Sequence, residues 1–269
     1  MKKHEYSDEH AKFLKKRRMN IALVWGLRIG VLALLLGFWE LSTACGWVDP
    51  FLTSSPSRIC TTIGSLYRDG SLFYHIGVTL AETLIGFFIA VGLGVVIALA
   101  LWWSDTLCKV LEPYIVVLNA LPKIALGPLI IIWFGTGSKA IIFMTVLVGI
   151  IVSTMHMLSA FLSTNKNKIL LLRSMGATKL QILQKLVIPS SRSSFISMLK
   201  VNVGMAWIGS IMGEYIVSRA GLGYLIVYGG QVFKLDLVMS ATFILCVLAA
   251  GMYFLVVLLE KMLIKNAQS

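Results

Sequence analysis

The sequence predicts an all-α membrane protein that crosses the bilayer six times. Of its 269 residues, 58% are hydrophobic and 13% are charged, and the mean hydropathy is +0.86. The charged fraction is about half that of a typical soluble protein. The apolar residues fall in blocks of about twenty or more, the length that spans about 30 Å of hydrocarbon as a helix. The six blocks occupy residues 21–43, 77–102, 109–134, 139–162, 195–217 and 237–263.

The first block, residues 21–43, is interpreted as a retained transmembrane helix. It follows a basic tail, as a signal peptide would, but it is too long for the usual apolar region and no A-x-A site follows. The domain organisation is then a tail (1–20), this helix, an external connection (44–76), a core of five transmembrane helices (77–263) and a second tail (264–269).

The net charge of +12 is distributed as topology charge. Lys and Arg gather in the first tail and in the loop 163–194, which contains no Asp or Glu. The positive-inside rule places these segments, and with six crossings both termini, in the cytoplasm. The expected partner is therefore the bilayer of the cell membrane and not nucleic acid.

The external connection, residues 44–76, carries turn signals and one short helix. Asp49-Pro50 and Ser54-Ser55-Pro56-Ser57 are turn sequences. Ser57 is expected to cap an amphipathic helix that runs through Tyr67 along the membrane surface. Cys45 and Cys60 lie on this side, so a disulfide is open, but free thiols are the favoured interpretation.

The second and third blocks contain residues that shape helix packing. Gly86, Gly92 and Gly94 in the second block allow close approach of another helix, either within the chain, which we favour, or at a subunit interface. The third block is interrupted by Pro113, Pro122 and Pro128 and is expected to be broken within the membrane. A broken helix indicates either a translocation path or a static kink.

Lys123 stands beside the break at Pro122. A charge inside a membrane marks a pathway or an ion pair. We expect Asn119, Pro122, Lys123 and Glu214 to belong to the pathway. The alternative is an ion pair of Lys123 with Glu82, Glu112 or Glu214, among which the sequence does not choose.

The loop 163–194 has the pattern of two short helices with a bend at Gly176. A run of apolar residues, Ile169 to Leu172, precedes the Gly, and apolar residues recur at helical spacing after it. Pro189 is expected to end the second helix. The pattern alone leaves two partners open, the anionic inner leaflet and a protein.

Motifs for chemistry within the chain are missing. The sequence has no G-x-x-x-x-G-K-[ST] phosphate loop, no H-E-x-x-H and no G-x-S-x-G. We therefore expect no catalysis, no metal site and no cofactor in this chain, and an energy source that lies in another protein.

The loop resembles the cytoplasmic loop of the permeases of ATP-binding cassette importers, whose pattern is E-A-A, three residues, Gly, nine residues, I-x-L-P. Gly176 and Pro189 have the required spacing, and Leu186-Val187-Ile188 matches in character, whereas Leu170-Leu171-Leu172 replaces the E-A-A triplet. By this resemblance the coupling residues are Leu172, Arg173, Gly176, Ala177, Leu186 and Pro189.

Four further strings resemble the branch of these permeases that serves nitrate, aliphatic sulfonates, taurine and pyrimidine precursors of thiamine. They are Ser55-Pro56-Ser57, Ala120-Leu121-Pro122-Lys123, residues 128–135 and Gly221-Leu222-Gly223-Tyr224-Leu225-Ile226. The resemblance covers residues 45–263.

The resemblance implies the remaining subunits. These are a second permease copy, two ATPase subunits that bind ATP and Mg²⁺ and receive the loop helices, and an extracytoplasmic solute-binding protein. Two alternatives to an importer permease are a secondary transporter driven by an ion gradient and a membrane scaffold or receptor subunit that transports nothing.

Overall fold

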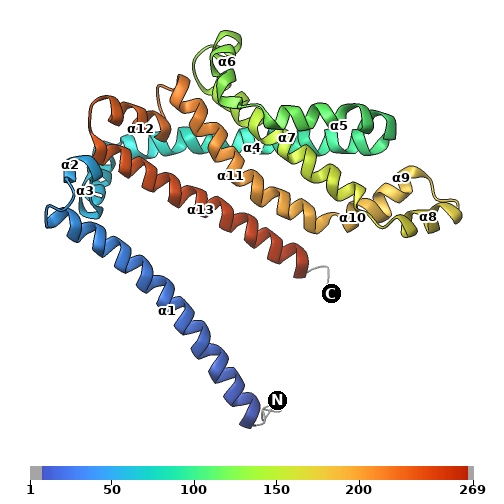
Figure 1. The fold of residues 1–269 in the computed structure, drawn as a ribbon, viewed down its shortest axis with the longest axis horizontal. Coiled ribbons are helices and arrows are strands. Elements are labelled where there is room, and N and C mark those ends of the chain that lie inside the picture. Colours follow the sequence, from blue (N-terminus) through green and yellow to red (C-terminus); the bar gives the residue numbers. More distant parts are fainter. Residues whose placement is uncertain (1–7, 266–269) are drawn as a thin grey trace. The chain divides into compact units, whose positions relative to one another are not determined.

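The computed structural model describes residues 8–265, which are helical throughout apart from short connections and contain no strand. The chain divides into two units, residues 1–62 and 63–269, with the boundary inside helix α3 (Pro56–Arg68). Figure 1 shows the order of the helices along the chain.

The first unit contains α1 (Asp8–Ala44), α2 (Pro50–Thr53) and the first turns of α3. Because α1 begins at Asp8, much of the predicted tail 1–20 is helical. The most apolar part of the stretch Lys16–Ala44 contains no buried residue. It therefore has the surface of a helix that lies in lipid.

The helix predicted in the external connection is present as α3, but its cap differs from the prediction. Ser57 lies inside the first turn, and its hydroxyl donates to Glu40 Oε1 at 2.7 Å while its backbone N–H donates to Glu40 Oε2 at 3.0 Å. The cap is Ser55, whose hydroxyl accepts from the N–H of Arg58 at 3.4 Å. All four cysteines have free thiols, in agreement with the favoured interpretation.

The second unit is built around three long helices, α4 (Ser71–Trp103), α7 (Ser138–Leu162) and α11 (Arg192–Val217), which pack against one another. The short helix α12 (Leu222–Gln231) and the long α13 (Leu235–Lys265) pack beside α11. The predicted segments are confirmed as helices, although α4 begins at Ser71 instead of residue 77.

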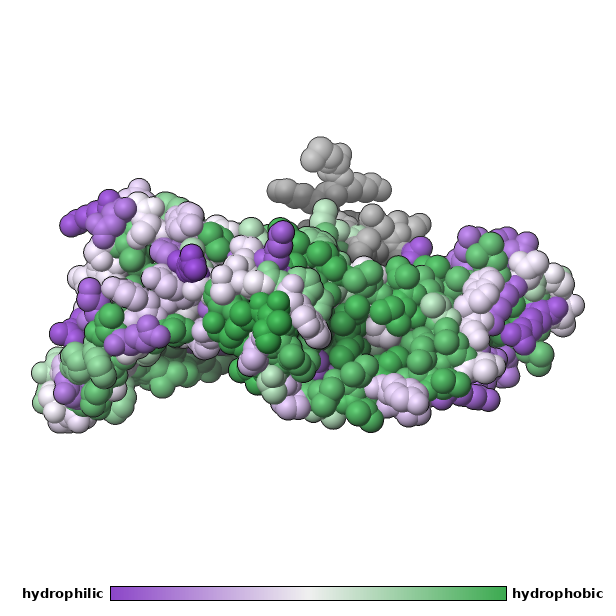
Figure 2. Space-filling model, turned by 90° about the horizontal axis from the view of Figure 1, so that it is seen from above, coloured by the Kyte–Doolittle hydropathy of each residue, from purple (hydrophilic) through white to green (hydrophobic). Residues whose placement is uncertain are grey.

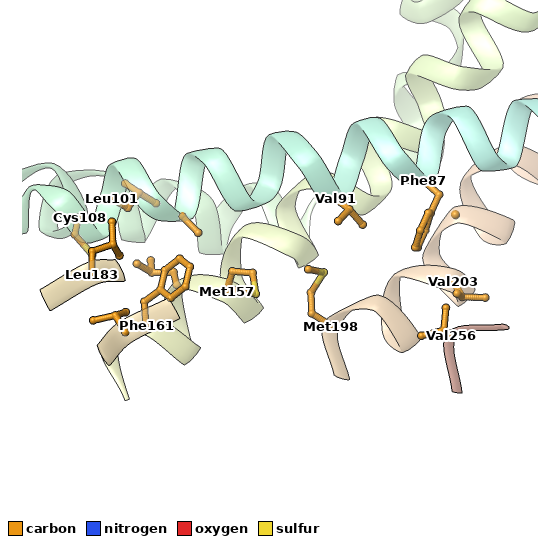
Figure 3. Close-up of a cluster of buried hydrophobic side chains, with 14 of the residues drawn as sticks. Phe87, Val91, Leu101, Cys108, Met157, Phe161, Leu183, Met198, Val203 and Val256 are labelled. Atoms are coloured by element: carbon orange, nitrogen blue, oxygen red, sulfur yellow. The ribbon is translucent and has the colours of Figure 1, made fainter. Parts of the chain in front are cut away.

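The core combines large apolar side chains with close helix contacts. Phe87, Val91, Met157 and Met198 belong to one buried cluster that joins α4, α7 and α11, and Figure 3 shows how their side chains point toward one another. Such burial excludes lipid and fixes the helices relative to each other.

Gly86 and Gly94 of α4 face α7, in the packing within the chain that the sequence favours. A Cβ on Gly86 would lie 2.5 Å from the Thr145 side chain, and a Cβ on Gly94 would clash with Ser153. Gly92, in contrast, has nothing within 4 Å. Gly86 and Gly94 therefore serve packing within the chain.

The third predicted segment is broken, as expected. It consists of α5 (Asp105–Ala120), a 3-10 turn η1 (Lys123–Leu126) and α6 (Gly127–Phe134), and its two halves are bent by 87°. The break lies at Pro122; Pro113 is accommodated inside α5 and Pro128 in the first turn of α6. Among residues 8–265, five helices are long and apolar enough to cross a membrane, and the number rises to six if the bent pair counts as one span.

Two loop helices, α8 (Lys166–Ser174) and α9 (Lys179–Ile182), form one end of the second unit, opposite α12 (Figure 1). Figure 2 shows hydrophobic residues over the middle of this unit and hydrophilic residues gathered where α8 and α9 lie. This distribution suits a protein whose middle lies in lipid and whose loop lies in water.

Candidate functional site

The loop between α7 and α11 begins with α8, which is capped at both ends. The Asn165 side chain accepts from the N–H groups of Asn167 at 2.9 Å and Lys168 at 3.4 Å. At the other end, Gly176 has a φ of +80°, its N–H donates to the carbonyl of Arg173, and the N–H of Ala177 donates to the carbonyl of Leu172. This is the Schellman arrangement, in which a residue with positive φ ends a helix. The bend predicted at Gly176 is confirmed.

The second loop helix begins with a capping box and contains a π-turn. Thr178 Oγ1 accepts from the N–H of Gln181, and Gln181 Oε1 accepts from the N–H of Thr178 at 2.8 Å. Helix α9 continues directly into a turn of π-helix, η2 (Leu183–Val187), and into α10 (Ile188–Ser190).

The prediction that Pro189 ends the second helix is wrong. Pro189 lies inside α10, and the helical segment turns only at Ser191, immediately before α11. Proline lacks the N–H that an α-helix would direct to the carbonyl four residues earlier. The wider π-turn directly before α10 is a known way in which a helix absorbs such an irregularity.

The two loop helices differ in burial. Ile182, Leu183 and Val187 of the second helical segment are buried in the main core cluster, with Val187 0% exposed. Helix α8 has no buried residue. The second segment is therefore anchored in the bundle, while α8 projects from it.

The apolar residues of the first loop helix divide between two faces. Leu172, with Ala177 after the bend, packs on the core cluster, as does Leu186 of the second segment. Leu170 and Leu171 are 67% and 59% exposed, and Met175 is 75% exposed. The loop thus presents a small apolar ridge, defined here as Leu170, Leu171 and Met175, at its outer surface.

Lys179 connects the loop to the last turn of α4. Its Nζ donates to the carbonyl of Trp103 at 2.6 Å. The same ammonium group lies 5.5 Å and 5.7 Å from the ring centroids of Trp102 and Trp103. A cation is favoured at a helix C-terminus, where carbonyls lack partners within the helix, and over an indole ring.

The structure brings together three of the four predicted pathway residues. Asn119 lies at the end of α5, Pro122 forms the break and Lys123 begins η1. Lys123 Nζ donates to the carbonyl of Asn119 at 3.1 Å. Within residues 8–265, the structure gives Lys123 no ion pair with Glu82, Glu112 or Glu214. Its place in a pathway stays a prediction.

Glu214 has a different role from its three companions. It is 1% exposed in α11, and its Oε2 accepts from the N–H groups of Gly223 at 2.6 Å and Tyr224 at 3.4 Å. These are among the N–H groups that have no partner in the first turn of α12. A carboxylate at a helix N-terminus is also favoured by the helix dipole.

Two side chains of α4 complete the attachment of α12. Thr79 Oγ1 accepts from the N–H of Leu222 at 2.8 Å, and His75 Nδ1 accepts from the N–H of Gly221 at 3.0 Å. The start of α12 is therefore held by side chains from α4 and α11, and its position depends on both helices.

The string Gly221-Leu222-Gly223 is explained by this attachment. Gly221 has a φ of +113°, and a Cβ there would lie 2.6 Å from Glu214 Cδ. A Cβ on Gly223 would lie 2.7 Å from Glu214 Cβ. Both positions require Gly, which is the sequence signal that points to a buried partner near α12.

The roles of His75, Thr79 and Glu82 were not predicted. Glu82 is 3% exposed on α4, and the Ser138 side chain at the start of α7 lies beside its carboxylate. The sequence offers these three residues only as scattered polar positions in or beside an apolar block. Their meeting with α7 and α12 depends on tertiary structure.

Comparison with known proteins agrees with this arrangement. Residues 90–266 match the family described as binding-protein-dependent transport system inner membrane component. The formylaminopyrimidine transport permease protein ThiX of Halalkalibacterium halodurans is 32% identical over 192 residues, which are 71% of this chain and 76% of that protein. The taurine transport system permease protein TauC of Escherichia coli is 25% identical over 228 residues, 83% of either chain.

Solved structures share the fold. A chain of the MetNI methionine transporter in inward-facing conformations has a TM-score of 0.64 at 18% identity, covering 72% of this chain and 96% of that chain. A chain of a bacterial alginate transporter in complex with its pentasaccharide-bound periplasmic protein has a TM-score of 0.60 at 13% identity, covering 94% and 96%.

These similarities exclude the two alternatives raised by the sequence, a gradient-driven transporter and a scaffold. Permeases of this family move solute and leave ATP hydrolysis to a separate subunit. With its apolar helices, its bent loop and the match over residues 90–266, the chain belongs to the binding-protein-dependent transport system inner membrane components, and it is a multi-pass permease subunit of an ATP-binding cassette importer.

Proposed function

We propose that this permease imports a small polar organic solute, either a sulfonate or taurine-like anion or a pyrimidine precursor. The support comes from the relatives named for formylaminopyrimidine and for taurine. The chain spans most of the length of both relatives.

Import is driven through the loop helices. The observation that carries this proposal is the unequal burial of the loop. The segment from α9 to α10 is anchored in the core, while α8 projects an apolar ridge, Leu170, Leu171 and Met175, into solvent. An exposed apolar cluster at the polar end of a membrane protein is typical of a protein interface. We assign it to the ATPase subunit, which we expect to supply the ATP and Mg²⁺ site.

The complete transporter contains two ATPase subunits, a second copy of this permease and an extracytoplasmic solute-binding protein. The alginate transporter of similar fold, captured with its periplasmic protein, supports the binding protein as a partner. The positive-inside rule puts the basic loop and both termini in the cytoplasm. The ends of α4 and α7 near α12 then face the binding protein.

The test is co-purification of the ATPase with the permease after both ridge leucines are replaced, Leu170→Ser with Leu171→Ser. We expect ATPase recovery to fall at least about tenfold, since two exposed apolar anchors at an interface contribute more than about 1.4 kcal/mol. Gln184→Ser is the matched control, because Gln184 is exposed on the anchored segment.

Gly176→Arg tests the same interface through the bend. The positive φ and the added side chain disturb the Schellman turn that orients α8. Undiminished ATPase recovery and uptake in both the leucine and the glycine variants would show that the loop does not dock the ATPase.

A further inference from the structure

A small hollow opens at the end of the bundle opposite the loop helices. It lies between the first turns of α4, the start of α7 and the connection from α11 to α12, and its volume is about 210 Å³. That volume corresponds to roughly seven water molecules at about 30 Å³ each. Its rim residues Tyr74, Thr136, Ser138 and Arg219 are exposed, whereas Glu82 is buried.

Glu82 lines this hollow, and one of its two carboxylate oxygens is without a hydrogen bond. The residue is 3% exposed, and its Oε2 has no hydrogen-bond partner among the described residues. Glu82 also lines a second, adjacent hollow of about 490 Å³, together with Phe73 and Tyr74. The Ser138 side chain hydrogen-bonds to this carboxylate, so only one of its two oxygens lacks a donor, and a buried acceptor without a donor destabilises the protein. A ligand that brings a positively charged N–H donor removes this cost.

Positive charge also lines the hollow. Helix α7 is 25 residues long, and no side chain caps its N-terminus, which lines the hollow at Gly137 and Ser138. Such a terminus attracts anions through its free N–H groups and its dipole. Arg219 lines the same hollow, and in the described part of the chain no ion pair joins it to Glu82. Its planar guanidinium group matches a carboxylate or sulfonate in geometry.

We propose that the hollow binds a small zwitterion, whose ammonium group bonds to Glu82 and whose carboxylate or sulfonate bonds to Arg219 and the start of α7. A ligand with one charge satisfies only one wall, and a neutral ligand satisfies neither. The hollow is large enough for a small organic molecule of this kind. The inference rests on the proposed function only in treating this end of the bundle as the side where solute arrives.

The probe is radiolabelled 2-aminoethanesulfonate, measured on the full-length permease assembled with its ATPase in lipid nanodiscs. We expect saturable binding that unlabelled 2-aminoethanesulfonate displaces at least about tenfold better than ethanesulfonate or ethylamine does, because each competitor lacks one of the two charges. Equal competition by ethanesulfonate would indicate an anion site, and equal competition by ethylamine a cation site. Either result, or no saturable binding, overturns the proposal.

Substitutions assign the two walls. Arg219→Gln changes an exposed side chain and leaves the fold intact, and it is expected to weaken binding about tenfold. Glu82→Gln is expected to abolish the preference for 2-aminoethanesulfonate over ethanesulfonate. Lys139→Gln is the control, because Lys139 is an exposed cation beside Ser138 that does not line the hollow.

Wild-type binding in Arg219→Gln, or an equal loss in Lys139→Gln, overturns the assignment. ATPase recovery and ATP hydrolysis are measured on the same samples. A wild-type complex that assembles and hydrolyses ATP without binding the zwitterion refutes the site alone. Failure of the wild-type permease to assemble with the ATPase refutes the proposed function.

Discussion

Replacement of Lys179 by Met is expected to loosen the loop from α4 without unfolding it. Met keeps most of the length and apolar stem of Lys but removes the charge and the donor. The loss includes the 2.6 Å bond to the carbonyl of Trp103 and the contacts with two indole rings. The anchors Ile182 and Val187 remain buried, so the second loop helix persists.

The magnitude follows from the individual contacts. A hydrogen bond from a charged group contributes about 1.5–3 kcal/mol, an exposed cation–π contact about 0.5–1 kcal/mol and a charge at a helix terminus about 0.3–1 kcal/mol. Lys179 is half-exposed and solvent weakens each term. We therefore expect a loss of about 1–2 kcal/mol, which opens the contact roughly 5–30 times more often.

Two measurements check this expectation. Amide hydrogen exchange in α9 is expected to accelerate roughly 5–30-fold in Lys179→Met, because local opening sets the exchange rate. In proteoliposomes with the ATPase and the binding protein, the solute moved per ATP is expected to fall while assembly is retained. Lys179→Arg is expected to restore both values, and Lys185→Met, an exposed position in the same segment, is expected to change neither. Unaltered exchange and transport ratio in Lys179→Met would refute the reasoning.

Three further predictions concern the bundle. Gly221→Ala is expected to lower the free energy of unfolding by about 3 kcal/mol or more, because positive φ costs about 1–2 kcal/mol and displacement of Glu214 leaves buried N–H groups without acceptors. Thermal unfolding in nanodiscs measures this loss, and an unfolding midpoint equal to that of the wild type would contradict it. Gly94→Ala is expected to lower the free energy of unfolding by about 1–3 kcal/mol by overpacking against Ser153. Gly92→Ala, with open space around it, is expected to change it by less than about 0.5 kcal/mol. Equal unfolding midpoints for the two variants would show that α4 is not packed as described. Lys123→Met is expected to weaken uptake while the complex still assembles, and unchanged uptake would remove Lys123 from the pathway.

The sequence predicted those features that depend on local patterns. The six crossings follow from block length, and the break follows from Pro122, which lacks a backbone donor. The bend at Gly176 follows from the conformational freedom of Gly. Each of these signals lies within a few residues of the structure that it determines.

Features that depend on contacts between distant residues were predicted less well. Ser55 caps α3 because the helix begins at Pro56, and Ser57, inside the first turn, bonds instead to Glu40, seventeen positions away. Pro189 continues a helix because the segment before it forms a π-turn whose apolar residues are buried in the bundle. Glu214 bonds to the start of α12, so its burial has a structural cause that composition alone does not show.

Helix α4 connects the two ends of the second unit and gives their chemistry a common mechanical element. With 33 residues it is about 50 Å long at about 1.5 Å per residue. One end accepts the bond from Lys179 of the loop, and the other carries Thr79, which holds α12, and Glu82, which lines the hollow. Because α4 is packed against α7 through Gly86 and Gly94, it resists bending and moves with α7. A displacement of the loop by the ATPase is therefore expected to reach the hollow through α4, and loss of Lys179 should weaken the effect of ATP on zwitterion binding while leaving binding without ATP unchanged.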